Sequence, residues 1–350
     1  ASMSGEGNLR VEENLGEGYV RLRVSEAERR QAKHDIQHVE DIVIEMLRNA
    51  RDAGADKVYL ATTKEDGVRT LVFLDNGSGV PQDMQERIFD ARVTSKLESM
   101  KMDRWGVHGR GMALFSIKQN TDEARVVTSD VDLGSVFKVS VATDRLGERA
   151  DQSSWPQAVK DEDGHYVCAR GPHNIIRAAC EFALEELRAC DVYLGSPSEI
   201  AATLHAQASS RLDASRLLFI DDEAELPVVD RLGLASDAED FIRICSGLGL
   251  EMSERTAHRI LAGQIKPVRG VTARLLRERD SSSHASAPVD LAKDRRGLRI
   301  AKDDMAQFSR AVERDFNDLA SRYYLNLCGD PKIRVSRDRI TVTFDLAKEE

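Results

Sequence analysis

The sequence predicts an α/β protein, in which a two-layer sandwich of helices on one face of a mixed sheet precedes a mostly helical C-terminal domain. Two observations support this prediction. Up to about residue 145, segments with the period-two alternation of strands are interspersed with segments whose apolar residues recur every three or four positions. After a polar stretch at 145–165, the apolar residues recur mainly at helical spacing.

The first part of the chain begins with an alternating strand pattern and then a long helical pattern. The helix has one apolar stripe and ends near Gly54, which is a suitable residue for a helix C-terminus. Two strand pairs follow, each around a short turn. In chain order we expect a strand at 19–24, a helix from 25 to 54, strands at 57–62 and 70–74, helices at 82–89 and 111–119, and strands at 125–129 and 135–142.

In the second part of the chain, the sequence predicts a series of helices that a Ser- and Ala-rich linker interrupts. A β-hairpin is predicted at its end. The expected helices span 173–189, 197–211, 238–248, 254–262, 268–278 and 301–327, and the hairpin strands span 332–335 and 339–344. We therefore expect an α/β domain at 1–148, a linker at 149–166, a helical domain at 167–280, a linker at 281–289, and a helix with a hairpin at 290–350.

Composition excludes several classes of protein. The 350 residues are 41% hydrophobic and 31% charged, which suits two packed domains. No apolar run approaches a membrane span, so we expect no membrane contact. The N-terminus lacks a secretory signal pattern, and the five cysteines form no C-x-x-C pair. We therefore expect reduced thiols and a cytoplasmic location.

Charge is uneven along the chain. The net charge of −10 argues against nucleic-acid binding by the whole surface, but residues 253–300 contain 11 Lys and Arg against 5 Asp and Glu. Helices at 253–262 and 267–277 could form a helix-turn-helix around Gly263. The alternative is an ordinary arginine-rich pair of helices. The basic side chains of these two helices and the turn between them are Arg255, Arg259, Lys266, Arg269, Arg274 and Arg277.

Four short motifs carry the chemistry. In the first, Glu45, Asn49 and Asp52 are four and three residues apart, which places three carbonyl-bearing side chains on one helix face. In the second, Asp75 ends a strand and begins D-N-G-S-G, whose glycines permit a sharp turn and close approach to a ligand. Taken singly, each also fits a solvated helix face or a plain turn.

The third motif is G-V-H-G-R-G at 106–111, directly before a predicted helix. Free backbone N–H groups and the positive helix end make such a position an anion site. The fourth is Gly134-Ser135 at the start of a strand. A glycine cluster alone is weak evidence for a phosphate site, whereas the order of all four motifs together is specific.

This order and spacing resembles the GHKL superfamily of gyrase, Hsp90, histidine kinases and MutL, over roughly residues 39–141. The resemblance implies a Mg²⁺-dependent ATPase with ATP between helices and sheet and a mobile lid at 91–105, whose closure is signalled to the C-terminal domain. It implies Glu45 as catalytic base, Asn49 as Mg²⁺ ligand, and Asp75 as acceptor for the adenine amino group, with Ser135 helping through a water. The implied nucleotide-binding residues are Asn49, Asp52, Asp75, Gly77, Gly79, Val80, Lys96, Gly106, Val107, His108, Gly109, Arg110, Gly111, Met112 and Ser135.

The chemistry of these residue types agrees with the implied roles. Mg²⁺ prefers oxygen ligands, and an amide oxygen adds no negative charge beside a triphosphate. A strand-end carboxylate near backbone amides is ionised and able to accept a hydrogen bond. Lys96 is a candidate phosphate cation or a solvent-facing lysine.

The subfamily stays open. The N-A-R-D-A-G-A and T-S-K segments are similar to MutL and type II topoisomerases, whereas R-I-F-D and G-R-G-M-A-L-F are similar to sensor histidine kinases. The expected helical C-terminal half differs from the strand-rich domain that follows in MutL and gyrase. The alternatives to hydrolysis are phosphotransfer to an unidentified protein partner and a nucleotide-sensing module on DNA; a homodimer is compatible with each.

His34 invites comparison with a phosphoacceptor histidine, because H-D-I resembles histidine-kinase acceptor boxes. It lies 11 residues before Glu45 on what the sequence predicts to be one helix, about 16 Å along its axis. A rigid helix cannot fold back on itself, so we interpret His34 as an ordinary polar helix residue.

Overall fold

The computed structural model describes residues 11–95, 101–103, 105–108, 111–149, 151–187, 189–212, 220 and 222–276, together with 305, 308–309, 312–313, 316, 325–329, 331–335 and 340–348. Contacts divide the chain into two compact units, Ala1–Ser281 and Ser282–Glu350. Each unit is described by itself.

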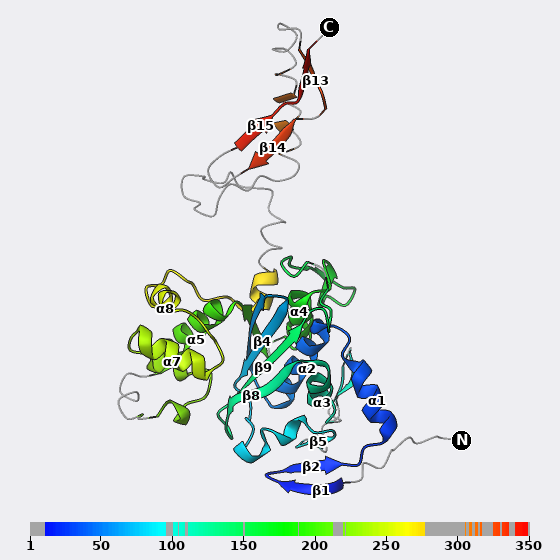
Figure 1. Cartoon of the computed structure of the whole chain (residues 1–350), viewed down its shortest axis with the longest axis vertical. Helices are drawn as coiled ribbons and strands as arrows, with labels where there is room; N and C mark the ends of the chain where they lie inside the picture. Colours follow the sequence, from blue (N-terminus) through cyan, green and yellow to red (C-terminus); the bar gives the residue numbers. More distant parts are fainter. Residues whose placement is uncertain are drawn as a thin grey trace, which may run out of the picture. The chain divides into compact units, whose positions relative to one another are not determined.

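A five-stranded sheet forms the centre of the first unit, in the order β12-β3-β4-β9-β8 (Figure 1). β3 (Lys57–Glu65), β4 (Val68–Asp75), β9 (Ser135–Ala142) and β8 (Glu123–Ser129) pair antiparallel. β12 (Asp191–Gly195) pairs parallel with β3 at the edge, so the sheet is mixed.

Helices α2 (Val39–Asp52), α3 (Ala113–Asn120) and α4 (Ile175–Glu185) cover one face of this sheet. Period-two alternation directs Leu60, Phe73 and Val139 toward them. The apolar stripe of α2, including Val43 and Leu47, fills the space between. The predicted α/β class, with a mixed sheet packed against helices, is confirmed.

The opposite face of the sheet is covered as well. Tyr59, Val72 and Leu74 point to that side and pack against α5 (Pro197–Arg211), α7 (Ala238–Gly247) and α8 (Glu254–Leu261). Figure 1 shows these three helices on the other side of the sheet from α2 and α3. Helical segments of the C-terminal half therefore form a third layer, which the two-layer prediction did not include.

The N-terminal segment forms a small sheet of its own. β1 (Val11–Gly16), β2 (Tyr19–Leu22) and β5 (Val93–Thr94) pair antiparallel, as Figure 1 shows. The helix predicted from residue 25 to 54 is instead two helices, α1 (Glu26–Asp35) and α2. The break has a clear cause: the Asp41 carboxylate accepts hydrogen bonds from the backbone N–H groups of Gln37 (2.8 Å) and His38 (2.9 Å) and thereby caps α2.

Short elements connect these layers. The segment 82–89, predicted as one helix, contains two 3₁₀ turns, η1 (Gln82–Met84) and η2 (Arg87–Phe89). Two others, η3 (Glu223–Glu225) and η4 (Arg231–Leu234), precede α7. β6 (Lys101–Asp103) pairs with β7 (Gly106–His108).

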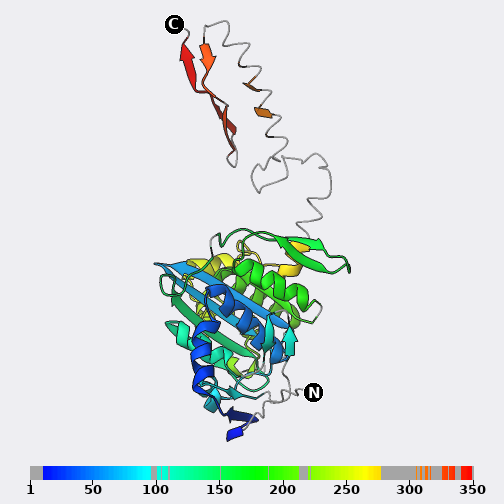
Figure 2. The same cartoon turned by 90° about the vertical axis from the view of Figure 1, so that its right-hand side faces the viewer.

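The predicted domain boundaries differ from the observed packing. β10 (Gln157–Lys160) and β11 (Tyr166–Arg170) form a hairpin, visible in Figure 2, within the segment expected to be a linker. Ala1–Ser281 form one unit, whereas we expected separate units at 1–148 and 167–280. The physical reason is β12, whose pairing with β3 joins the later segment to the first sheet.

In the second unit, β14 (Lys332–Val335) and β15 (Ile340–Thr343) form the predicted hairpin. β13 (Leu325–Leu327) pairs with β16 (Leu346–Lys348), at the end of the segment expected to be helical. The linker expected at 281–289 lies outside the described residues. No helix among the described residues combines the length and the hydropathy that crossing a membrane requires.

Candidate functional site

A cavity of about 500 Å³ lies between the sheet and the helices α1, α2 and α3. Its volume falls within the usual range for small-molecule sites, about 300–1,000 Å³. Residues from three of the four sequence motifs named above, together with Ser135 from the fourth, line this one space. They are Glu45, Asn49, Asp52, Asp75, Gly79, Val80, Gly111, Met112 and Ser135.

Asp75 lies at the end of β4, and its side chain is buried at 3% exposure. Its Oδ1 accepts a hydrogen bond from the Gly77 backbone N–H at 2.9 Å. A Cβ at Gly77 would lie 2.8 Å from the Ala53 carbonyl oxygen, which explains why this position is a glycine. Ser135 begins β9 directly opposite Asp75 and is equally buried. The sheet therefore presents a carboxylate and a hydroxyl side by side to the cavity.

Gly79 allows two loops to approach each other closely. It has φ +71°, and a Cβ there would lie 1.7 Å from the carbonyl oxygen of Asp130. Ser129 ties the same loops together, because its hydroxyl accepts from the Val80 N–H (2.7 Å), donates to the Gly134 carbonyl (2.9 Å) and lies 3.0 Å from the Ser135 hydroxyl. Sequence reasoning missed Ser129, which only the fold brings to this position.

The polar face of α2 supplies Glu45, Asn49 and Asp52, as their spacing predicts. Asp52 accepts a hydrogen bond from Arg51 Nε at 2.9 Å, and Glu45 Oε1 accepts one from Arg48 Nη1 at 2.6 Å. The amide nitrogen of Asn49 is buried without a hydrogen-bond partner among the described residues. This unpartnered buried N–H donor suits a ligand with an acceptor oxygen, such as a phosphate.

The N-terminus of α3 faces the same cavity. The helix begins at Ala113, and Met112 at its N-cap offers no side-chain hydrogen bond to the first N–H groups. Gly111 has φ +67°, and a Cβ there would lie 2.8 Å from the Val93 carbonyl oxygen. Free N–H groups at a helix start are suited to binding phosphate.

The glycine segment before α3 differs in part from the expected phosphate loop. Gly106, Val107 and His108 form strand β7, because their backbone pairs with β6. Lys96, Gly109 and Arg110 lie outside the described residues, so their predicted roles stay predictions.

Charge in the cavity is mainly negative. Among the described residues that line it, five carry carboxylates and two carry guanidinium groups: Glu28, Asp35, Glu45, Asp52 and Asp75 against Arg48 and Arg92. A triphosphate placed here would be repelled unless a cation entered with it. The lining therefore fits a nucleotide accompanied by Mg²⁺, with Asn49 and the neighbouring carboxylates as oxygen donors.

The N-terminal segment contributes lining residues that the sequence did not reveal. Tyr19 from β2, and Gln31 and Asp35 from α1, line the cavity, as does Thr94 from β5. Burial raises the pKa of the Tyr19 hydroxyl, which therefore stays protonated at neutral pH. Arg92 forms an ion pair with Glu28 of α1. No periodic pattern marks these residues, because tertiary packing alone brings them to the motifs.

His34 is exposed near the end of α1 and is not among the residues that line the cavity, although its neighbour Asp35 is. The expectation of one continuous helix through His34 and Glu45 was wrong, since α1 ends at Asp35. The interpretation of His34 as an ordinary polar helix residue does not change, because His34 does not line the cavity.

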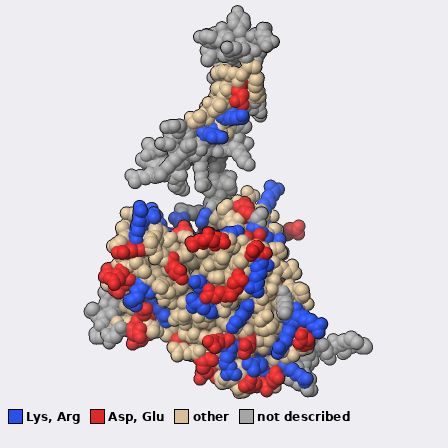
Figure 3. Space-filling model, in the orientation of Figure 1, with Lys and Arg blue, Asp and Glu red and all other residues tan. Residues whose placement is uncertain are grey.

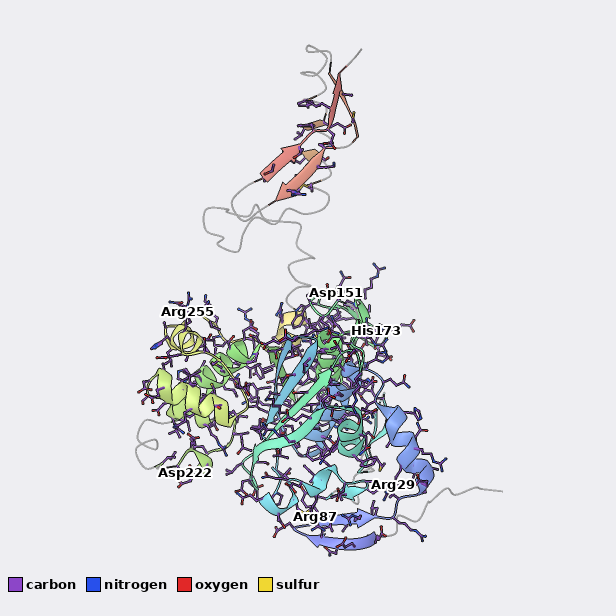
Figure 4. The ribbon with its side chains drawn as sticks, in the orientation of Figure 1. Arg29, Arg87, Asp151, His173, Asp222 and Arg255 are labelled. Atoms are coloured by element: carbon purple, nitrogen blue, oxygen red, sulfur yellow. The ribbon has the colours of Figure 1, made fainter. Side chains whose placement is uncertain are left out.

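The basic segment does not form the helix-turn-helix that was one of the two alternatives for it. Ala257 and Ile260 of α8 pack in the core on one face of the sheet, whereas Val271 and Leu275 pack in the core on the other face. The helices at 254–261 and 271–276 are therefore not partners. Arg274 lies over the Trp155 ring, 3.9 Å from its centroid, and Arg277 lies outside the described residues. Arg255 projects from the outer side of α8 (Figure 4).

Comparisons with known proteins agree with the site. Residues 36–152 match the family described as histidine kinase-, DNA gyrase B-, and HSP90-like ATPase. The DNA mismatch repair protein MutL of Thermodesulfovibrio yellowstonii is 34% identical over 98 residues, 27% of this chain and 18% of that protein. MutL of Pediococcus pentosaceus is 31% identical over 115 residues (32% and 17%), and MutL of Staphylococcus aureus 28% over 136 residues (36% and 20%).

These matches have a limited extent. The chain spans at most about a fifth of the length of these curated relatives, and the family match covers the segment that holds α2, the four motifs and most of the sheet. The family match falls on the part of the chain that forms most of the cavity. Residues 36–152 are therefore an ATPase-type domain of the GHKL superfamily, whose subfamily is unresolved.

Proposed function

We propose that this domain binds ATP with Mg²⁺ in the cavity and hydrolyses it. One observation carries the proposal: Asp75 at the end of β4, Glu45 and Asn49 on α2, and the uncapped N-terminus of α3 all face one cavity. These groups lie on three elements, β4, α2 and α3, and each suits a different part of the nucleotide.

The adenine would bind at the sheet. Asp75 is buried and would accept a hydrogen bond from the adenine amino group, while Gly79 lets the backbone pass close to the base. The phosphates would lie toward the N-terminus of α3, whose first N–H groups have no side-chain cap and attract anions. The positions of these groups support this orientation of ATP.

Mg²⁺ would be held by the Asn49 amide oxygen and by the phosphates. When bound, the ion neutralises phosphate charge and helps to orient the triphosphate. Asn49 is suited to this role because its amide is buried beside Glu45 and Asp52 without adding a further charge.

Glu45 would act as the general base. It lies one helical turn before Asn49 on the same face, so its carboxylate can accept a proton from a water next to the terminal phosphate. Such a base contributes typically about 10²- to 10⁴-fold in rate. We further propose that nucleotide-dependent closure of 91–105 is passed to the helical segments that cover the other face of the sheet.

ATP turnover tests the proposal. The wild-type protein should release phosphate from ATP with Mg²⁺ and stop on addition of EDTA. Glu45→Ala should bind ATP with wild-type affinity but lose at least 100-fold in turnover. The matched control is Glu65→Ala, which removes an exposed carboxylate at the tip of β3 and should leave turnover unchanged.

A second outcome points to another function for the same site. If the wild type binds ATP with Mg²⁺ but releases no phosphate, alone or with DNA, the cavity serves phosphotransfer to a protein partner or nucleotide sensing. Labelled γ-phosphate then distinguishes these two functions, because only phosphotransfer moves the label onto a protein.

DNA is a second candidate ligand, favoured by the exposed side of the segment after Ser253. Arg255, Arg259, Lys266 and Arg269 are exposed there, and the relatives are DNA mismatch repair proteins by name. Elsewhere on the surface, acidic and basic side chains are interspersed, as Figure 3 shows for one face. DNA contact would therefore be local to this segment.

A further inference from the structure

A buried group of charged side chains lies behind the proposed general base. Arg48 and Arg51 of α2 extend from the helix toward hairpin β6–β7, where both contact Asp103. The side chains of Arg48, Arg51 and Asp103 are between 3% and 6% exposed. Charged groups this deeply buried are stable only when paired with good geometry.

Arg48 uses separate atoms for two carboxylates. Its Nε and Nη2 donate to the two oxygens of Asp103 at 2.9 and 3.0 Å, a bidentate pair. Its Nη1 donates to Glu45 Oε1 at 2.6 Å. The planar guanidinium therefore fixes the direction of the Glu45 carboxylate relative to hairpin β6–β7.

We propose that Arg48 is a positioning residue, which holds Glu45 toward the cavity and is itself held in place by Asp103 of hairpin β6–β7. The inference rests on the proposed function, since it assigns a role in the reaction that Glu45 would catalyse. Arg48 also lines the cavity, but its proposed role in the reaction is exerted through Glu45.

The sequence spacing explains why Arg48 can do this. Residues three apart on a helix are neighbours, so Glu45 and Arg48 meet without strain. Glu45 is 22% exposed on the cavity side, whereas Arg48 is 3% exposed. Because Arg48 is buried and paired with Asp103, it limits the directions that the Glu45 carboxylate can take.

Arg51 strengthens the same arrangement. Its Nη1 donates to Asp103 Oδ2 at 3.0 Å and to Glu186 Oε1, directly after α4, at 3.1 Å. Burial lowers the pKa of the Arg51 guanidinium, but the hydrogen bonds to Asp52, Asp103 and Glu186 outweigh burial and raise it. Arg51 is therefore a permanent cation, and it helps to anchor Asp103 where Arg48 needs it.

The central test measures turnover and ATP affinity in Arg48→Gln. We expect kcat to fall by about 10- to 100-fold, because misplacing a catalytic group by about 1 Å can cost 10²-fold. The ATP dissociation constant should stay within about threefold of wild type, since Asn49 and Asp75 are unchanged. The matched control is Arg177→Gln, which removes another buried helical arginine paired with a carboxylate, Glu181, and should leave kcat unchanged.

A double variant separates positioning from general structural damage. In Glu45→Ala, the added Arg48→Gln change should cause no further loss of turnover, because Arg48 acts only through Glu45. If Arg48→Gln lowers the residual turnover of Glu45→Ala as much as it lowers wild-type turnover, the proposal is wrong. It is also wrong if Arg48→Gln alone keeps kcat within twofold of wild type.

Two milder variants, Arg48→Lys and Asp103→Asn, test the proposal even if Arg48→Gln does not fold. A lysine keeps the charge but cannot reproduce the planar fork to two carboxylates, so kcat should lie between wild type and Arg48→Gln. Asp103→Asn should lower kcat while leaving the ATP dissociation constant unchanged. Wild-type kcat in both variants would overturn the proposal.

Failure of the proposed function would look different. A wild-type protein without turnover would refute the catalytic role of Glu45 and, with it, the positioning of that residue. The link between Arg48 and Asp103 is then tested by urea unfolding: the shifts caused by Arg48→Gln and Asp103→Asn should be non-additive. Additive shifts would show that the hairpin is not held through Arg48.

Discussion

Replacing Asp75 by Asn tests the adenine end of the site. Asp75 Oδ1 accepts a hydrogen bond from the Gly77 N–H at 2.9 Å. An asparagine that keeps this bond places its amino group where the second carboxylate oxygen was, facing the adenine amino group. The flipped amide loses the Gly77 bond instead. In either orientation one donor faces another, which costs about 1–3 kcal/mol at a buried site.

This cost corresponds to roughly 5- to 150-fold weaker ATP binding. Isothermal titration calorimetry with Mg²⁺ measures it directly. Asp66→Asn serves as the control, because it makes the same charge change in the turn before β4, and Asn tolerates the positive φ of 48° at that position. If Asp75→Asn binds ATP within twofold of wild type, Asp75 does not contact the base and the proposed orientation of ATP is wrong.

Two further predictions concern the loop beside Asp75 and the outer side of α8. Gly79→Ala should lower the thermal unfolding midpoint by at least about 5 °C, because the new Cβ meets the Asp130 carbonyl and φ is +71°. The control Gly147→Ala should have little effect, because its Cβ meets no neighbouring atom within 4 Å. Equal midpoints for the two variants would argue against the close approach at Gly79. If the segment after Ser253 binds DNA, the affinity should fall steeply with salt, and charge reversal should abolish it, whereas no wild-type binding at about 50 mM salt would end the idea. The residues to reverse to Glu are Arg255, Arg259 and Arg269.

The sequence predicted the polar residues of the motifs that line the cavity, but not the residues that tertiary packing adds to them. Glu45, Asn49 and Asp52 share a face because helical spacing is a local property, and Asp75 ends a strand because the D-N-G-S-G turn follows it. Tyr19 lines the same cavity only through the pairing of β2 with β5, and Ser129 reaches the loops beside it only through the pairing of β8 with β9. No local pattern encodes those pairings.

Two features of the fold had weak signals. The break between α1 and α2 has no Gly or Pro; it depends on Asp41 capping the backbone at Gln37 and His38, where a histidine takes the usual place of Ser or Thr. β12 is only five residues long, and it lies between helices. Val192 and Tyr193 lie on opposite faces of the sheet, and this alternation identifies a strand only when the pairing with β3 is known.

The buried Arg48–Asp103 pair was also beyond sequence reasoning, because 55 residues separate its members. The third layer, formed by the helices α5, α7 and α8, could not be predicted from the sequence either. The sequence predicts that α5 and α7 are helices, but only the folded sheet shows that both of its faces are apolar and need covering.

A structure of the protein with Mg²⁺ and a non-hydrolysable ATP analogue tests the central claim most directly. The account predicts the adenine amino group at hydrogen-bond distance from Asp75, about 2.7–3.2 Å, and Asn49 Oδ1 about 2.1 Å from Mg²⁺. It also predicts the terminal phosphate beside Glu45 and the N-terminus of α3. An analogue bound outside this cavity, or bound in it with its base away from Asp75, would contradict the account.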